Sequence, residues 1–112
     1  MKYKIVLVPF PFDDLSSSKV RPAICLTDEI PPFGHIVVAF ITSKIAPGSA
    51  ATDLIIDSGD ADFAVSGLKV SSTIRLHRLV TISKSLIKRE LGELSQNQRD
   101  AIKTRLRNLF EL

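Results

Sequence analysis

The segment Thr73–Arg78 combines side chains that could handle a phosphate group. In a β-strand, alternation would give one face with Thr73, Arg75 and His77 and another with Ile74, Leu76 and Arg78. An arginine holds anions through its planar guanidinium group, and a histidine titrates near neutral pH and can transfer a proton. Arg75 and His77 together suit phosphodiester cleavage, in which phosphoryl oxygens gain charge and the leaving alkoxide takes up a proton. The same pattern is also typical of the exposed polar face of a structural sheet.

Two further positions place polar side chains where a strand meets a loop. Arg21 follows the polar segment Asp13–Lys19, whose short side chains favour a turn or loop, and precedes a second apolar run. Thr42 closes the apolar run that begins at His35, and Ser43 and Lys44 follow it. A hydroxyl group at such a strand end could bind a phosphate, although Thr-Ser at this place is more often simply the start of a loop.

The sequence offers no pattern for a bound cofactor or metal. Two histidines and a single cysteine, far apart, match no zinc-binding spacing. There is no glycine-rich phosphate loop, nucleophile elbow or dinucleotide fingerprint. Cys25 lies in an apolar run, which predicts a buried, unreactive thiol, and a lone cysteine suits a reducing cytoplasm. An enzyme with this sequence would therefore work with scattered side chains and no cofactor.

Length and charge set the outer limits of the interpretation. A chain of 112 residues, 45% hydrophobic and 24% charged, predicts one globular domain. Its apolar runs are far shorter than the roughly 20 residues that span a bilayer, and its N-terminus shows no signal-peptide cleavage pattern. Residues 1–70 hold six Lys/Arg and eight Asp/Glu, whereas residues 71–112 hold nine and four. The basic second part could meet phosphate or an acidic partner, or could simply be a solvated face.

Hydrophobic patterning predicts a mainly β protein with a C-terminal helix. Strands are expected at residues 4–8, 20–27, 35–42, 52–56, 72–82 and 86–91. The third is nearly all apolar, which predicts burial on both faces. Ser95 with Gln98 forms a capping-box signature before an apolar stripe of Ala101, Ile102, Leu106, Leu109 and Phe110. Short strands at close spacing favour a small, strongly bent antiparallel sheet or barrel.

Four sequence blocks, in order, resemble the PemK/MazF family, the toxins of type II toxin–antitoxin modules. The first block runs Val8-Pro9-Phe10-Pro11-Phe12-x-Asp14-Leu15, and the others are Arg21-Pro22-Ala23, Ile41-Thr42-Ser43 and the Arg75 strand with Leu79-Val80-Thr81-Ile82-x-Lys84. The resemblance extends from about Val6 to the C-terminal helix. It implies that residues 1–112 form a single PemK/MazF-like toxin domain.

The resemblance implies a fold, an activity and partners. The fold would be a small SH3-like barrel with a C-terminal helix, usually dimeric. The activity would be metal-independent cleavage of single-stranded RNA, in which a 2′-hydroxyl attacks the adjacent phosphorus and leaves a 2′,3′-cyclic phosphate and a 5′-hydroxyl. The partner would be a cognate antitoxin whose acidic, disordered tail folds on binding. DNA would be contacted only through the antitoxin, no membrane would be involved, and the protein would be cytoplasmic.

The resemblance also implies roles for particular residues. Arg21 and Thr42 match catalytic positions of the better-known members, and Arg75 and His77 match an arginine and an acidic residue used by others. His77 replaces that acid with imidazole, which can still act as a base or an acid. The residues expected to bind substrate are Phe12, Asp14, Ser16, Ser17, Lys19, Ser43, Lys44 and Thr73. In the family, the loop that contains the positions from Phe12 to Lys19 lies over the substrate groove.

Two other functions stay open on the same fold. One is a non-enzymatic toxin that grips a protein, like the related gyrase poison, and the other is an inactivated relative that only binds antitoxin. Arg21, Thr42 and Arg75 favour cleavage, because a binder would not need this phosphate-handling set. The acidic pair Asp13 and Asp14 and the histidine at position 77 leave room for the inactivated relative.

Overall fold

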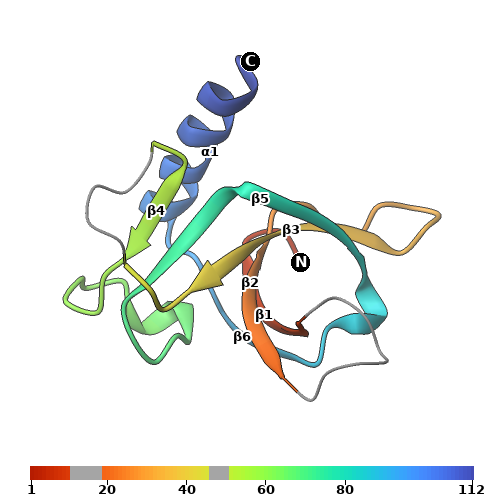
Figure 1. The fold of residues 1–112 in the computed structure, drawn as a ribbon, viewed down its shortest axis with the longest axis horizontal. Helices are drawn as coiled ribbons and strands as arrows, with labels where there is room; N and C mark the ends of the chain where they lie inside the picture. Colours follow the sequence, from red (N-terminus) through yellow and green to blue (C-terminus); the bar gives the residue numbers. More distant parts are fainter. Residues whose placement is uncertain (11–18, 46–50) are drawn as a thin grey trace.

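Six strands form one antiparallel sheet in the part of the chain that this computed structural model describes, residues 1–10, 19–45 and 51–112. The strand order is β4–β5–β3–β2–β1–β6, and the sheet curls into an open half-barrel beside a C-terminal helix (Figure 1). The strands are β1 (Lys4–Pro9), β2 (Val20–Cys25), β3 (His35–Thr42), β4 (Asp53–Ile56), β5 (Ser72–Ser83) and β6 (Arg89–Glu93). The predicted fold class is confirmed.

The last strand begins later than the sequence pattern suggested. A 3-10 turn, η2 (Lys84–Leu86), occupies the expected start, so that β6 pairs with β1 only from Arg89 onward. The short apolar run around Leu86 and Ile87 packs instead against a core cluster that comes mainly from β1, β2 and β3. Apolar residues that pack from a turn give the same sequence signal as a strand, which explains the shift.

The two faces of the sheet are buried in two separate cores. Successive residues of a strand point to opposite faces, and in β1 Ile5 and Val6 enter two different cores. β3 repeats this division, with Ala39 and Ile41 in the first core and Val38 in the second. The first core lies toward the helix, because it includes Ile102. The prediction that the third strand is buried on both faces is confirmed.

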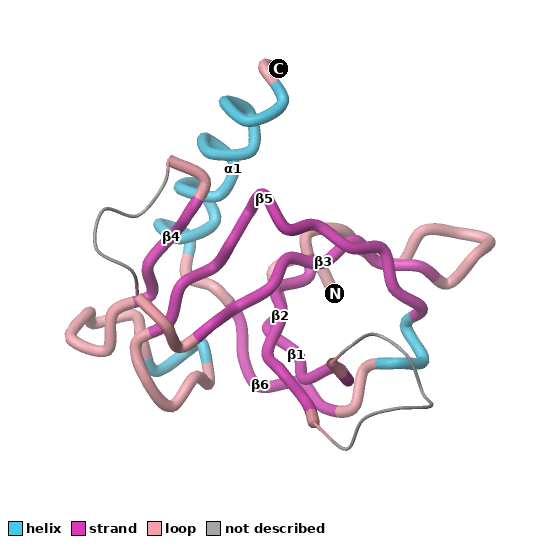
Figure 2. Tube along the Cα trace, viewed as in Figure 1, coloured by secondary structure: helices cyan, strands magenta, loops and turns pink. Residues whose placement is uncertain are grey.

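β5 carries an insertion that bends it. Across β3, Ala39 pairs with Leu79, but the next residue, Phe40, pairs with Arg75. Three residues of β5 therefore lie between two consecutive pairs, and the strand changes direction sharply near its middle (Figure 2). A bulge of this kind bends a strand and re-aims its side chains. The bulge therefore interrupts the simple alternation of side chains along residues 73–78.

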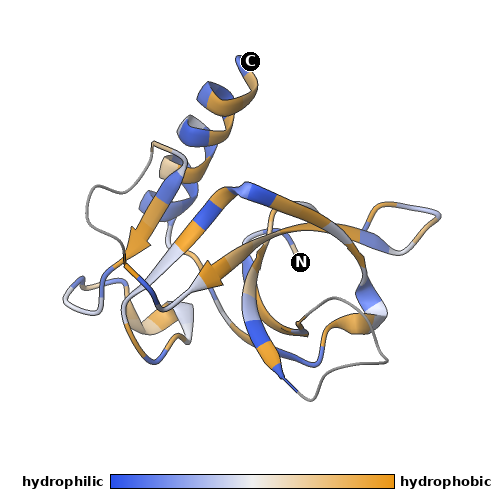
Figure 3. Ribbon diagram, viewed as in Figure 1, coloured by the Kyte–Doolittle hydropathy of each residue, from blue (hydrophilic) through white to orange (hydrophobic). Residues whose placement is uncertain are grey.

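The C-terminal helix, α1 (Gln96–Phe110), begins at the predicted capping box. The Ser95 hydroxyl accepts a bond from the Gln98 amide at 3.2 Å, and the Gln98 side chain accepts one from the Ser95 amide at 2.9 Å. Ile102 is fully buried, whereas Leu109 and Phe110 are exposed. The C-terminal end of the helix extends past the sheet (Figure 3). Across the described residues, no helix is long and apolar enough to cross a membrane.

Two glycines allow the other 3-10 turn, η1 (Ala64–Ser66), to pack closely against β6. Gly67 has a φ of +71° and packs on the Leu91 backbone, while a Cβ on Gly92 would lie 2.6 Å from the Ser66 carbonyl oxygen. Backbone atoms cannot move aside as a flexible side chain could. The close approach fixes the segment after η1 relative to β6.

Replacing Gly92 with alanine should destabilise the protein by about 2–3 kcal/mol, because the new methyl group overpacks against the η1 backbone. The measurement is the free energy of unfolding by urea denaturation. Gly59→Ala is the matched control, since a Cβ there meets only the Asp57 carboxylate at 3.5 Å. Equal stability of the two variants would show that η1 does not hold its position against β6.

The Cys25 thiol should be nearly inert in the folded protein. The side chain is fully buried, as the sequence predicted, and burial raises its pKa to about 11. Only about 0.1% of the thiol is then ionised at pH 8, and the thiolate is the reactive form. Reaction with an aromatic disulfide reagent should release one thiol equivalent per chain in guanidinium chloride and almost none without it. Rapid reaction of the native protein would contradict this burial.

Candidate functional site

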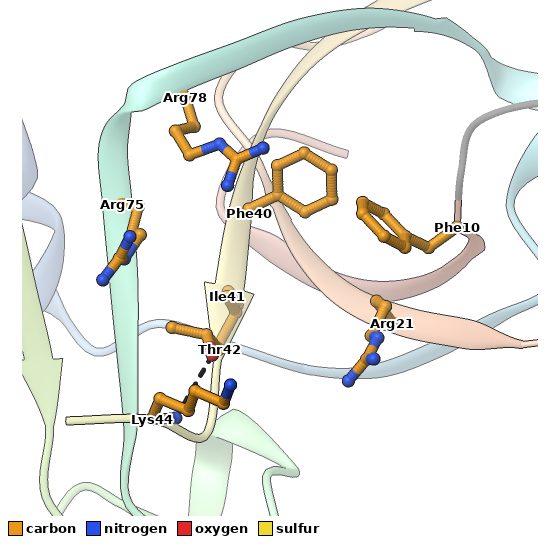
Figure 4. A pocket seen from close by; sticks show the side chains of 8 residues that line it. All are labelled: Phe10, Arg21, Phe40, Ile41, Thr42, Lys44, Arg75 and Arg78. Carbon is orange, nitrogen blue, oxygen red and sulfur yellow. Dashed lines mark hydrogen bonds between the residues drawn. The ribbon is translucent and has the colours of Figure 1, made fainter.

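A cavity of about 280 Å³, here named the first cavity, opens where β1, β2, β3 and β5 come together (Figure 4). It is lined by Phe10, Arg21, Phe40, Ile41, Thr42, Lys44, Arg75 and Arg78. Phe10 directly follows β1, and its amide bonds to the Lys19 carbonyl at the base of the first hairpin. The sheet therefore gathers side chains that lie far apart in the sequence.

The described lining of the first cavity carries four cations and no acid. Arg21, Lys44, Arg75 and Arg78 form no ion pair with any described residue. Some acids of the described residues pair elsewhere, as Glu90 does with Lys4 at 3.2 Å. Clustered like charges without counter-charges raise the local positive potential. Such a cavity favours an anion, and a phosphate group fits the arginine fork.

An aromatic pair positions two of the arginines. The rings of Phe10 and Phe40 meet edge to face with centroids 5.1 Å apart. The Arg21 guanidinium carbon lies 5.9 Å from the Phe10 centroid, and that of Arg78 lies 5.2 Å from the Phe40 centroid. Cation–π attraction at these distances restricts the position of each guanidinium group. It does not use the hydrogen-bond donors of that group.

Thr42 presents a hydroxyl group between Arg75 and Arg21 in the view of Figure 4. Its oxygen accepts a hydrogen bond from the Lys44 amide at 3.2 Å. Because this bond uses an oxygen lone pair, the hydroxyl proton remains able to donate to a phosphate oxygen. The predicted Thr42, Lys44, Arg21 and Arg75 are thus brought together.

Arg75 has an unused donor at this site. Its Nε atom is buried, and among the described residues it has no hydrogen-bond partner. Asp53 faces Arg75 directly across β4 and β5, yet the two side chains form no ion pair, and the Asp53 Oδ1 atom is also buried without a described partner. An unsatisfied buried donor costs about 1–3 kcal/mol. Because Nε has almost no accessible surface, an anion would reach it only after the Arg75 side chain moved.

His77 does not join Arg75. Its Nδ1 atom lies 3.4 Å from the Thr52 hydroxyl, and Arg78 lines the first cavity in its place. The prediction that alternation puts Arg75 with His77 and sends Arg78 to the other face is wrong, because the bulge at residues 76–78 interrupts the alternation. Thr73, expected on the same face, is only 3% exposed and is not part of the lining.

Of the other predicted substrate-binding residues, the structure describes only Ser43 and Lys19. Ser43 lines a neighbouring cavity, and Lys19 is exposed just before β2. Phe12, Asp14, Ser16 and Ser17, together with Asp13, lie outside the described residues.

Sequence reasoning missed Phe10 and Phe40 as well as Arg78. The two rings read as ordinary strand residues, and their contact depends on the pairing of β1, β2 and β3. The described residues contain no group of three or more histidine, cysteine or acidic side chains that could hold a metal ion.

Comparisons with known proteins agree with this fold. The profile of the PemK-like, MazF-like toxins of type II toxin–antitoxin systems matches residues 1–110. The Mycobacterium tuberculosis toxin MazF-mt6 superposes with a TM-score of 0.73 at 27% identity, covering 97% of both chains. An Mtb toxin superposes with a TM-score of 0.64 at 29% identity, covering 79% of this chain and 90% of that one.

A more distant relative shares the fold alone. It is an endoribonuclease from a mycobacterial species in complex with its cognate antitoxin, with a TM-score of 0.75 at 14% identity, covering 100% of this chain and 95% of that one. A search of curated proteins finds no significant match. Because the family profile spans nearly the whole sequence, the chain belongs to the PemK/MazF-like toxins of type II toxin–antitoxin systems.

Proposed function

We propose that this toxin is an endoribonuclease that cleaves single-stranded RNA without a metal ion. The observation that carries the proposal is the first cavity, whose described lining combines Arg21, Arg75 and Arg78 with Thr42 and contains no acid. The mycobacterial endoribonuclease with the same fold supports the reaction type. RNA would enter as a strand with unpaired bases, the form that most proteins read by sequence.

The reaction would be an internal transfer at phosphorus. The 2′-oxygen attacks the adjacent phosphorus atom, the bond from phosphorus to the 5′-oxygen breaks, and the products are a 2′,3′-cyclic phosphate and a 5′-hydroxyl. Extra negative charge builds on the phosphoryl oxygens in the transition state, and the three arginines would stabilise it. Thr42 would donate to one of these oxygens and orient the phosphate.

Proton transfer completes the balance. The 2′-hydroxyl loses one proton and the leaving 5′-oxygen gains one. Among the described residues the first cavity is lined by no imidazole or carboxylate, so we assign both transfers to water in this open site. Charge stabilisation by arginine would then supply most of the rate enhancement.

The antitoxin and a second copy of the chain complete the proposal. We infer that an acidic antitoxin segment binds the same uncompensated cations and thereby blocks RNA, since complementary charge favours that encounter. The exposed Leu109, Phe110 and Leu112 at the end of α1 offer apolar surface for a homodimer. The proposal includes a cytoplasmic location, because a lone free thiol suits a reducing compartment and the proposed RNA substrate would be met there.

Arg21→Ala should reduce RNA cleavage by about 100-fold or more, because one positioned charge donor is lost from the transition state. The measurement is the cleavage rate of a defined single-stranded RNA in EDTA, with end-group analysis of the products. Arg107→Ala is the matched control, since Arg107 is exposed on α1 away from the cavity. Undiminished cleavage by Arg21→Ala would refute the assignment.

The end groups separate the candidate functions. Products with a 5′-hydroxyl support the proposed reaction. No cleavage of any RNA, together with growth arrest in cells, would instead support a toxin that grips a protein partner.

His77→Ala should retain cleavage to within about tenfold, whereas Arg75→Ala should lose about 100-fold or more. The difference follows from placement, because Arg75 lines the first cavity and His77 lies beside Thr52. Rates are compared between pH 5 and 8, since a catalytic imidazole titrates in that range. A large loss in His77→Ala, with the acid limb of the pH profile abolished, would restore the role predicted from the sequence.

A further inference from the structure

A second cavity of about 330 Å³ adjoins the first. Its polar lining includes Arg21, Lys69 and Arg89, and its apolar lining includes Leu68 and Leu91. Arg21 and Ile41 line both cavities, and Ser43 in the second directly follows Thr42 in the first. A chain-like ligand that reaches the first cavity can therefore continue into the second.

The charge of the second cavity is also uncompensated. No acid among the described residues lines it, and Arg21, Lys69 and Arg89 form no ion pair within the described part of the chain. Alternation along β6 explains the separation of charges. Arg89 and Leu91 point into the cavity, while Glu90 between them pairs with Lys4 at 3.2 Å.

The wall of the second cavity is held in place before any ligand binds. Gly67 begins the segment 67–70 that lines it, and this glycine packs directly on the Leu91 backbone of the opposite wall. Leu68 also packs against the first hydrophobic core. A rigid wall lowers the entropic cost of ordering a flexible ligand.

The combination of apolar wall and cationic rim selects the ligand. An apolar surface between leucine side chains suits the flat face of a nucleobase, and arginine and lysine suit its phosphate. A volume of about 330 Å³ falls within the range of small-ligand sites. A purely acidic peptide would leave the leucines uncovered, and an apolar peptide would leave the cations unpaired.

We propose that the second cavity binds the nucleotide next to the scissile phosphate, with its base against Leu68 and Leu91 and its phosphate against Lys69 and Arg89. This inference rests on the proposed function, because it needs an RNA strand in the first cavity. It assigns the choice of the neighbouring base to residues outside the first cavity. Arg21 lines both cavities, so it would contribute both to binding of the neighbouring nucleotide and to cleavage at the scissile phosphate.

The test measures binding apart from cleavage. The probe is a fluorescent single-stranded RNA that the protein cleaves, made non-cleavable by a 2′-O-methyl group at the reacting position, and the readout is anisotropy. Lys69→Ala and Arg89→Ala should each weaken binding about 5- to 10-fold. Each should also lower the slope of log affinity against log salt by about 0.7, the value for one lost phosphate contact on a single strand.

Matched controls are available for both side chains. Lys88→Ala removes an exposed lysine beside Arg89 that does not line the cavity, and Arg107→Ala removes an exposed arginine on α1. Both should bind the probe within about twofold of the wild type and keep its salt slope. Thermal unfolding of all four variants checks that the fold is intact.

A second probe locates the base. A 4-thiouridine placed beside the reacting nucleotide should cross-link, on irradiation, to residues 67–70 or 89–91. Cross-links elsewhere, or variants that bind like their controls while the wild type cleaves RNA, overturn the subsite and leave the proposed function standing. A wild type that neither binds nor cleaves RNA overturns both. Variants that lose only the antitoxin, or only self-association, show a protein-docking surface and overturn the subsite.

Discussion

The bulge in β5 is the constraint on which the candidate site depends. Between the pairs Ala39–Leu79 and Phe40–Arg75, β5 contains three residues that β3 does not match. This insertion allows Arg75 and Arg78, which regular alternation would separate, to reach one cavity. It also turns the second half of β5 so that Val80 and Ile82 serve a different core from Ile74 and Leu76. One local irregularity thus shapes both the half-barrel and the arrangement of its cations.

Uncompensated charge is the second organising feature. In folded proteins, side chains of like charge are usually spread apart or paired with opposite charges, because like charges repel when they are close. Here Lys4, Lys84 and Arg99 do have acidic partners, whereas the cations of the two cavities have none in the described residues. The aromatic rings of Phe10 and Phe40 offset part of that repulsion by attracting Arg21 and Arg78. The described part of the chain thus has a cationic surface, which suits the polyanion that we propose as substrate.

Much of the fold could be read from the sequence, because strands, turns and the capping box have local signals. The apolar period of two located most strands, and Ser95 with Gln98 located the helix start. Arg21, Thr42, Lys44 and Arg75 were found because each lies in a motif or at a strand end. The sequence places His77 and Arg78 on the wrong faces. A bulge depends on how two strands pair, and it leaves no periodic signal in the sequence of either strand alone. The second cavity was missed for a related reason, since η1 and β6 meet only in three dimensions.

The placement of Arg21 links these features. It stands on β2 in the middle of the sheet order, stacks near Phe10 and lines both cavities. A guanidinium group has five donors in a planar fork, so it can bind two neighbouring phosphate oxygens at once. An RNA strand held there would have its scissile phosphate on one side and its next nucleotide on the other. Recognition of the neighbouring base would then help to set the position of the reacting phosphate, and a misplaced strand would lose rate as well as affinity.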